Sequence, residues 1–302
     1  MTQITSKILF FLMVSTCLIL IALFPRDAMV TGKGRAVTVV YSYEFSWQVY
    51  KENLTGFYNG MLNEKTMGKT RYHKPVEEEI AIYFPRSLKI IITAFFLSLV
   101  TGIAKGIFDF KKTHKPANIF GNGTTWLFLS NPDFFMILSV QWVIIFYFNW
   151  IDIFGHEYWY NFIIPSLLVS IYPSMYISRI TSAAIAGEAV QQYVQVAKSK
   201  GFNQNAIILK HILKNCANPI LNSTPSMVIY ILSNLLFVEY LLDYKGAAYR
   251  LWLALDFKSS IFIGRETLYE PSVVIGFGIC FLVIVLIVQI TSQLVSRVID
   301  PR

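Results

Sequence analysis

The sequence has 302 residues, of which 55% are hydrophobic and only 15% are charged. A soluble domain usually carries about 25% charged and about 45–50% apolar residues, so this composition excludes an ordinary water-soluble globular protein and indicates a lipid environment. The net charge is +8. Because the basic residues lie mostly between apolar runs, we attribute this charge to cytoplasmic loops and not to nucleic-acid binding.

Cysteine and histidine usage gives no sign of a disulfide framework or a metal centre. The three cysteines, Cys17, Cys216 and Cys280, are far apart, and the four histidines are also scattered. Zinc sites and disulfide-stapled domains need closer and more regular spacings. We therefore expect no metal ion, no cofactor and no catalytic cluster in this chain.

Six apolar runs are long enough to cross a bilayer, whose hydrocarbon core of about 30 Å needs roughly 20 helical residues. The first run, Ile8–Phe24, stops at Pro25 and is not followed by a small-residue cleavage site. We therefore interpret residues 1–24 as a retained anchor helix and not as a secretory signal peptide. The other five spans are predicted at about residues 88–107, 126–148, 162–177, 224–242 and 273–295.

The expected fold is an all-α polytopic membrane protein with about six transmembrane helices. Residues 25–83 are polar and are expected to form a small extracytoplasmic segment, in which the alternation of Ala36–Tyr43 predicts a strand. Residues 84–302 are expected to form the main transmembrane domain. The third span is interrupted by Asn131-Pro132-Asp133.

The basic residues of the loops predict the orientation in the membrane. The segments that follow spans two and four are strongly basic and each contains a single acid, whereas residues 149–161 contain no Lys or Arg. Cytoplasmic loops carry the excess of Lys and Arg, so the two basic segments belong inside. With six spans, both termini are then cytoplasmic.

The most informative segment is the inner loop of residues 180–221. Tyr193, Val194, Val196 and Ala197 form one helical face, and Gly201 stands where a left-handed C-terminal cap is expected. A second helix is indicated by the apolar residues after it, and we expect Pro219 to close that helix. The pattern predicts a helix–glycine–helix elbow. By pattern alone, it fits either an amphipathic pair lying on anionic lipid or a docking knob for a partner protein.

The residues of this loop resemble the EAA loop of binding-protein-dependent ABC importer permeases, in particular the dipeptide, oligopeptide and nickel branch. Arg179 is similar to the arginine that usually closes span four in that branch. Gln195 departs from the acid of the first loop position, and Lys245 replaces a proline. The matching segments, in a resemblance that covers roughly residues 76–302, are Gln192-Tyr193-Val194, Ala197-Lys198-Ser199-Lys200-Gly201, Lys210-His211-Ile212-Leu213-Lys214-Asn215, Pro219, Val238-Glu239, Gly246, Pro271 and Asp300-Pro301-Arg302.

The resemblance implies the type I ABC importer permease fold and the role of a first-permease subunit. Such a subunit pairs with a second, different permease, with two cytoplasmic ATPases and with an extracytoplasmic solute-binding protein in the bacterial inner membrane. It implies that the chain itself is not an enzyme, because the ATPase subunits hydrolyse ATP. The implied cargo is a peptide, with nickel or a metal chelate as the alternative.

The same resemblance implies that the elbow is a coupling helix seated in a cleft of one ATPase. Ala197 and Gly201 would be small so that two backbones can approach closely, and Phe202 would be a buried apolar anchor. Lys198 and Lys200 would pair with acids at the rim of the cleft. The coupling residues implied in this way are Tyr193, Gln195, Ala197, Lys198, Lys200, Gly201, Phe202, His211 and Asn215.

Polar residues within the predicted spans are candidates for lining the path or for packing helices, because they are costly in lipid. These residues are Asp133, Gln141, Asn234 and Glu239. Gly102 and Gly106 form a G-x-x-x-G pair that favours close helix packing. We expect Lys105, near the end of span two, to extend its stem to the lipid headgroups.

Two further classes of protein fit the sequence less well than a transport subunit does. A membrane-anchored sensor or assembly factor would use residues 25–83 for sensing, but such a protein rarely needs six spans. A secondary transporter would more often have two similar halves and charged residues at mid-membrane depth, and neither is evident in the sequence.

Overall fold

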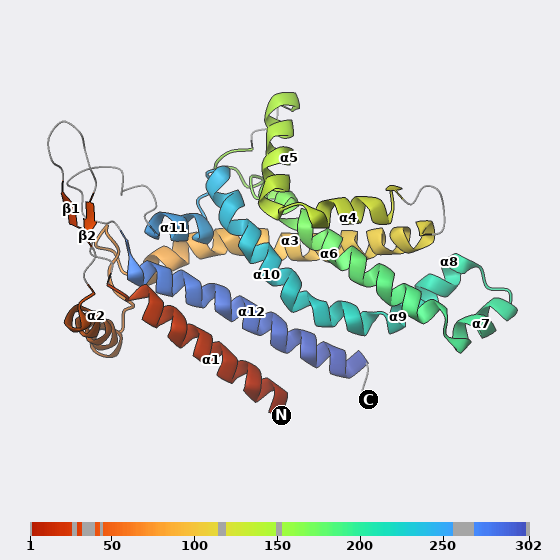
Figure 1. Ribbon diagram of the computed structural model, residues 1–302, viewed down its shortest axis with the longest axis horizontal. Coiled ribbons are helices and arrows are strands. Elements are labelled where there is room, and N and C mark those ends of the chain that lie inside the picture. Colours follow the sequence, from red (N-terminus) through yellow and green to blue (C-terminus); the bar gives the residue numbers. More distant parts are fainter. Residues whose placement is uncertain are drawn as a thin grey trace. The chain divides into compact units, whose positions relative to one another are not determined.

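The computed structural model describes residues 2–25, 29–31, 40–42, 45–113, 119–148, 153–255 and 269–299. Within these ranges the chain is helical apart from one two-stranded sheet (Figure 1). It divides into two compact units. Unit 1 comprises Met1–Ser87 and Lys245–Leu286, and unit 2 comprises Leu88–Tyr244 and Ile287–Arg302.

Among the described residues, five helices are long and apolar enough to cross a membrane. They are α1 (Thr2–Ala22), α3 (Val76–Lys112), α6 (Ile163–Ala189), α10 (Ala217–Leu241) and α12 (Pro271–Ile299). The pair α4 (Asn122–Ser130) and α5 (Asp133–Tyr147) adds a sixth if it is counted as one bent span. The prediction of an all-helical membrane protein with about six transmembrane helices is therefore confirmed.

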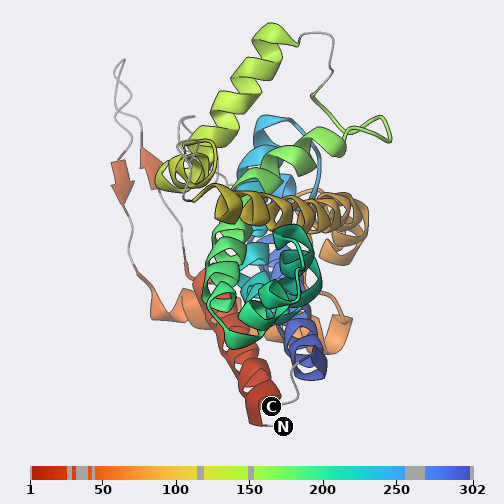
Figure 2. The same ribbon diagram turned by 90° about the vertical axis from the view of Figure 1, so that its right-hand side faces the viewer.

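The third predicted span, residues 126–148, is not a single straight helix. α4 and α5 are bent by 105° at the break between them, and Figures 1 and 2 both show α5 turning away from α4. Asn131 has extended dihedral angles of −93° and 148°, as expected for a residue that precedes proline. Pro132 is the N-cap residue of α5, so the proline ends one helix and starts the next.

Unit 1 contains α1, a hairpin of β1 (Met29–Thr31) and β2 (Val40–Ser42), α2 (Trp47–Asn59), the π-helical turn η1 (Gly60–Glu64) and α11 (Ala247–Ala254). The start of α3, up to Ser87, and the first half of α12, up to Leu286, also belong to it. The two strands are antiparallel, with Val30 opposite Tyr41. β2 overlaps the strand predicted at Ala36–Tyr43, and residues 36–39 and 43 lie outside the described residues.

A buried ion-pair cluster holds the centre of unit 1 together. The Arg250 side chain of α11 is 2% exposed and donates through Nε to Glu79 (2.6 Å) and through Nη1 and Nη2 to Glu270 (3.0 and 2.8 Å). Burial alone would lower the pKa of Arg250, but the hydrogen bonds to Glu270 and Glu79 outweigh it and raise this pKa above its ordinary value. The cluster therefore joins α3 and α11 to the residue before α12.

Unit 2 contains most of α3 and all of α4, α5, α6 and α10. Between α6 and α10 it contains α7 (Gln192–Ser199), α8 (Gln204–Ile207), the π-helical turn η3 (Ile208–Ile212) and α9 (Leu213–Asn215). Pro219 was predicted to close the helix before it, and this prediction is wrong. The residue lies in the first turn of α10, where proline is tolerated.

α3 packs closely against α6 because two of its residues have no side chain. A Cβ added to Gly102 would stand 2.7 Å from the Ile177 Cβ, and one added to Gly106 would stand 2.5 Å from the Thr181 Cβ and 2.7 Å from the Ser178 carbonyl oxygen. All three distances are shorter than van der Waals contact. The expectation that this glycine pair serves helix packing is therefore confirmed.

Gly106→Val should separate α3 from α6 and destabilise unit 2 by about 1–3 kcal/mol, the usual cost of overpacking. Gly187→Ala is the matched control on α6, because a Cβ there meets nothing within 4 Å and alanine favours helix over glycine. Thermal unfolding of the detergent-solubilised protein should show a lower midpoint for the first variant and an equal or higher one for the second. Equal midpoints for Gly106→Val and the unmodified protein would contradict the close packing.

Candidate functional site

The elbow between α6 and α10, residues 190–216, has a sharply defined turn at its centre. After α7, the Gly201 N–H donates to the Lys198 carbonyl (2.9 Å) and the Phe202 N–H donates to the Ala197 carbonyl (3.3 Å). These two bonds form a Schellman motif, in which the residue after the helix takes a left-handed conformation. Gly201 has a φ of +79°, which glycine adopts without steric cost. The predicted glycine cap is thus present.

The second arm of the elbow starts at a capped helix end. The Asn203 side chain accepts a hydrogen bond from the Ala206 N–H (2.7 Å), as a good N-cap residue does. The Phe202 ring lies edge-on to the His211 ring, with centroids 5.8 Å apart. The first residue after the glycine turn is therefore in contact with the second arm.

Glu188, in the last turn of α6, ties both arms of the elbow to the end of the helix. Its Oε2 accepts hydrogen bonds from the Tyr193 hydroxyl (2.6 Å) and from the Asn215 Nδ2 (3.3 Å). Burial is the largest cause that raises the pKa of Tyr193 to about 12, and the hydrogen bond to Glu188 is the second. Burial is also the largest cause that raises the pKa of Cys216 to about 11, followed by the negative charge of Glu188. Both groups are therefore un-ionised at neutral pH.

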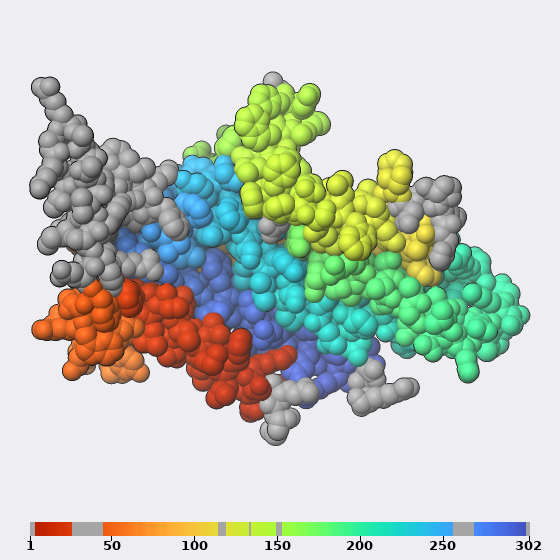
Figure 3. All heavy atoms as spheres, viewed as in Figure 1, coloured from red at the N-terminus to blue at the C-terminus, as the bar shows by residue number. Residues whose placement is uncertain are grey.

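The elbow has a buried face and an exposed face with different compositions. The buried residues, which hold the arms together, are Val194, Ala197, Ile207, Ile208, Ile212 and Cys216. The exposed face combines apolar side chains with cations: Val196 is 54% exposed, Phe202 46% and Leu209 57%, and Lys198, Lys200, Lys210 and Lys214 are also exposed. Figure 3 shows the atoms of this segment, coloured green to teal, at the right-hand edge of the view.

The structure brings together some of the predicted coupling residues and separates others. Tyr193 meets Asn215 through Glu188, and Phe202 meets His211. Gln195 is exposed, and Ala197 is buried inside the elbow itself. A Cβ at Gly201 would meet nothing within 4 Å, so within this chain the glycine is needed for its backbone conformation. Sequence reasoning missed Glu188 as the residue that joins the arms.

The structure describes the side chains of three of the four predicted intramembrane polar residues. Asn234 of α10 is 1% exposed, and neither atom of its amide group has a hydrogen-bond partner among the described residues. It lines a small cavity together with Tyr172 of α6. Gln141 and Glu239 are also buried. The side chain of Asp133 lies outside the described residues.

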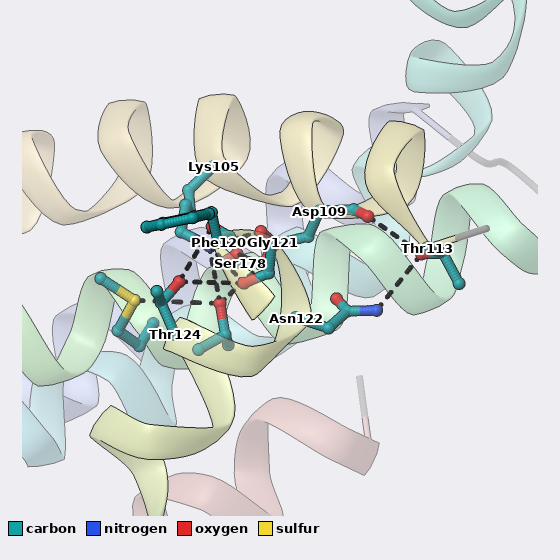
Figure 4. A network of polar contacts seen from close by, with 10 residues as sticks. Lys105, Asp109, Thr113, Phe120, Gly121, Asn122, Thr124 and Ser178 are labelled. Carbon is teal, nitrogen blue, oxygen red and sulfur yellow. Dashed lines mark hydrogen bonds and ion pairs between the residues drawn. The ribbon is translucent and has the colours of Figure 1, made fainter. Parts of the chain in front are cut away.

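A second polar cluster, which sequence reasoning did not find, links α3, α4 and α6 (Figure 4). Asp109 is fully buried and accepts from Lys105, from the Thr125 hydroxyl (2.6 Å) and from the Ser178 hydroxyl (2.8 Å). The Lys105 amine also donates to the Gly121 carbonyl (3.0 Å). The prediction that Lys105 extends to the headgroups is therefore wrong, because its charge is paired inside unit 2.

The sequence does contain a signal for this cluster. Lys105 and Asp109 are four residues apart, so they lie on the same face of α3. Removing one member of a buried ion pair typically costs about 3–5 kcal/mol, because the other charge is left without compensation. The cluster therefore fixes α3 and α4 to the part of α6 that leads into the elbow.

Comparison with known proteins identifies the family. Residues 114–302 match the family described as binding-protein-dependent transport system inner membrane component. The match covers more than half of the chain and includes the elbow. The chain belongs to this family. It is therefore a permease component of an ABC importer, a multi-pass protein of the bacterial inner membrane that works with ATPase and solute-binding partners.

Individual relatives agree with this assignment. The chain is 24% identical over 217 residues to the glutathione transport system permease protein GsiC of Salmonella typhimurium. The aligned region covers 72% of this chain and 69% of that protein. It is also 24% identical over 173 residues to GsiC of Escherichia coli K12, and this alignment covers 57% of this chain and 56% of that protein.

Solved structures support the prediction that this chain has the type I ABC importer permease fold. Two inward-facing crystal forms of the MetNI methionine ABC transporter resemble it, with TM-scores of 0.54 and 0.58. They cover 71% and 73% of this chain and 93% and 96% of the solved chain. Sequence identity is only 12% and 14%, so the likeness concerns the fold alone.

Glu188→Ala should loosen the elbow of this permease by removing the acceptor that both arms share. Hydrogen bonds to a charged group are worth about 1.5–3 kcal/mol each, so trypsin should cleave after Lys198 and Lys200 about tenfold faster or more. Tyr193→Phe should reproduce part of the effect. Because the pKa of Tyr193 is raised from 10.0 to about 12, its bond stabilises the elbow below pH 10 and is lost as the pH rises through 12.

The control for this experiment is Gln195→Ala, which changes an exposed side chain of the same helix. It should leave the cleavage rate unchanged. The difference between the unmodified protein and Tyr193→Phe should also be constant between about pH 7 and pH 9, where the phenol keeps its proton. Unchanged cleavage in Glu188→Ala would show that Glu188 does not hold the arms.

Proposed function

We propose that this permease subunit forms one half of the translocation path of a peptide importer and that its elbow is the part on which a cytoplasmic ATPase acts. The second half of the path would come from a different permease subunit, in a heterodimer. The chain would hydrolyse no ATP itself, because the separate ATPase subunits supply that chemistry. An extracytoplasmic binding protein would deliver the solute.

The exposed face of the elbow carries this proposal. Apolar side chains at Val196, Phe202 and Leu209 are exposed beside four lysines, although they lie in a segment that polar contacts hold in one shape. An exposed apolar patch rimmed by charge is typical of a protein-binding surface. A partly exposed aromatic residue supplies affinity once it is buried by a partner, whereas rim charges mainly speed the encounter.

The contacts of α6 support a mechanical role for the elbow. α6 has 27 residues and is about 40 Å long at 1.5 Å per residue, so it reaches beyond a hydrocarbon core of about 30 Å. Glu188 ties the elbow to one end of this helix, and the Asp109 cluster and the Gly102 and Gly106 contacts tie α3 to its side. A displacement of the elbow would therefore move α3 and α6 together, as rigid-body switching requires.

The orientation proposed from the loops places the elbow and both termini in the cytoplasm. The exposed lysines of the elbow agree with the rule that cytoplasmic segments carry excess positive charge. In this orientation the polar segment after α1 faces the outside, where a solute-binding protein would dock. Lys105 is paired with Asp109 and so adds no net positive charge to the segment after span two. The exposed lysines of the elbow still support the orientation.

Peptide cargo is supported by the two relatives named above, whose cargo is glutathione, a tripeptide. Buried polar side chains within the helices, such as Asn234 and Gln141, have amide groups that could hydrogen-bond to peptide groups. We propose these two residues, together with Asp133 and Glu239, as candidates for lining the path or for packing helices.

Gly201→Asp should abolish uptake by the assembled importer while leaving membrane insertion intact. Aspartate tolerates the left-handed backbone of this position better than most residues do, so the main change is a carboxylate at the docking surface. Uptake of labelled peptide into proteoliposomes and co-purification of the ATPase should both fall by roughly tenfold or more. Gly201→Asn, which adds the same bulk without the charge, should have a smaller effect.

The matched control is Gly155→Asp. Gly155 has a φ of +80° and, like Gly201, offers open space to a Cβ, but it lies outside the elbow. This variant should keep both uptake and ATPase co-purification. Normal uptake by Gly201→Asp, or equal losses in the two variants, would contradict a coupling role for the elbow.

A further inference from the structure

A small pocket of unit 2 lies next to the polar cluster of Figure 4, where α3, α4 and α6 meet. Its volume is about 290 Å³. The walls include the cation Arg179 and Ser182 of α6, together with Trp126 of α4. The remaining wall is partly apolar and includes Phe110, Ala183 and Ala186. The family assignment and the coupling role of the elbow make no use of this pocket.

Three hydrogen-bond donors that line the pocket have no partner in the described part of the chain. They are the Arg179 guanidinium, the Ser182 hydroxyl and the Trp126 indole N–H. Arginine presents five N–H groups and no acceptor, and an indole is also a donor only. Arg179 is exposed and Ser182 is half-buried, so an anion from outside the chain can reach these donors and bind to the guanidinium through charge-assisted hydrogen bonds.

Asp109, the acid of the neighbouring polar cluster, does not supply that anion. Asp109 already accepts from Lys105, Thr125 and Ser178. Thr113, another pocket residue, accepts from the Asn122 amide (3.2 Å). The local carboxylate is therefore compensated without Arg179, whose positive charge has no acidic partner among the described residues.

We propose that this pocket binds the phosphate group of an anionic phospholipid from the cytoplasmic leaflet. A volume of about 290 Å³ is at the lower limit of small-molecule pockets, about 300–1,000 Å³, and so suits a headgroup and not a whole nucleotide. Trp126 is 68% exposed, as expected for an aromatic residue at the membrane interface. Basic pockets between helices on the cytoplasmic side are typical sites for anionic headgroups.

This inference rests on the proposed orientation, which places the end of α3 and the last turns of α6 at the inner surface of the membrane. Free inorganic phosphate has the same chemistry as the headgroup. The lipid source is favoured because three apolar residues, Phe110, Ala183 and Ala186, line the pocket beside its polar residues. These side chains would contact the glycerol and the first methylene groups of a lipid, whereas they offer nothing to a soluble ion.

The test is native mass spectrometry of the purified importer complex, delipidated in detergent and then supplied with phosphatidylglycerol or phosphatidylcholine. The unmodified complex should retain phosphatidylglycerol in preference to phosphatidylcholine. Arg179→Gln should weaken that retention by about tenfold or more, because it removes charge-assisted hydrogen bonds. Arg179→Lys keeps the charge without the planar fork and should retain an intermediate amount.

Lys210→Gln is the matched control, because it removes one exposed cation from the elbow at a residue that does not line the pocket. It should retain lipid as the unmodified complex does. Equal loss in Lys210→Gln and Arg179→Gln would show attraction by overall charge and would overturn the pocket. If Arg179→Gln fails to assemble, Ser182→Ala serves as a second, structurally mild variant. It should lose less phosphatidylglycerol than Arg179→Gln would, but more than Lys210→Gln.

Millimolar inorganic phosphate should leave the bound phosphatidylglycerol in place. Displacement by phosphate from the unmodified complex, with no preference between the two lipids, would assign the site to a soluble anion and overturn the lipid source. The measurement needs neither ATP nor solute. It can therefore fail or succeed independently of the coupling role of the elbow, which the uptake assay measures.

Discussion

Short helices cannot hold their own shape in water, and the elbow between α6 and α10 is made of short helices. Isolated helices below about 12–15 residues are marginally stable even with favourable sequences, whereas α7 has 8 residues, α8 has 4 and α9 has 3. Their order depends on the Glu188 carboxylate, which both arms approach, on the Gly201 turn and on the Asn203 cap. The same contacts leave Phe202 and its apolar neighbours exposed to a partner.

The buried charges of this protein act as fixed points between helices. Arg250 joins three segments of unit 1, and Asp109 joins three helices of unit 2. Each charge is compensated by an opposite charge and by further hydrogen bonds, as a low-dielectric interior demands. In unit 2 the Asp109 cluster includes Ser178 of α6, the helix whose last turn contains Glu188. An input at the elbow would thus reach α3 and α4 without passing through a flexible loop.

The sequence predicted the parts of the fold that depend on one segment at a time. Apolar runs revealed the helices, and the glycine at position 201 revealed the centre of the elbow, because both signals are local. Hydropathy underestimated the helices themselves: α3 begins at Val76 and α6 continues to Ala189, since polar helical turns outside the bilayer carry no apolar signal. Pro219 was misread because a proline can end one helix or begin another.

Contacts between segments were harder to predict. Asp109 needs donors from α4 and α6, and Glu188 needs donors from both arms of the elbow, so neither role follows from the residues alone. The coupling residues came from a resemblance to a family, and the family assignment now supports that resemblance. The resemblance did not indicate Glu188 as the residue that ties the elbow to α6.

The most direct test of the account is photo-cross-linking from position 202 in the assembled importer, with a benzophenone amino acid in place of Phe202. The account predicts a cross-link to the ATPase subunit, and a yield that changes between nucleotide-free and ATP-trapped complexes. Cross-links to lipid alone, or to the extracytoplasmic solute-binding protein, would contradict it, because the elbow would then not be the surface on which the ATPase acts.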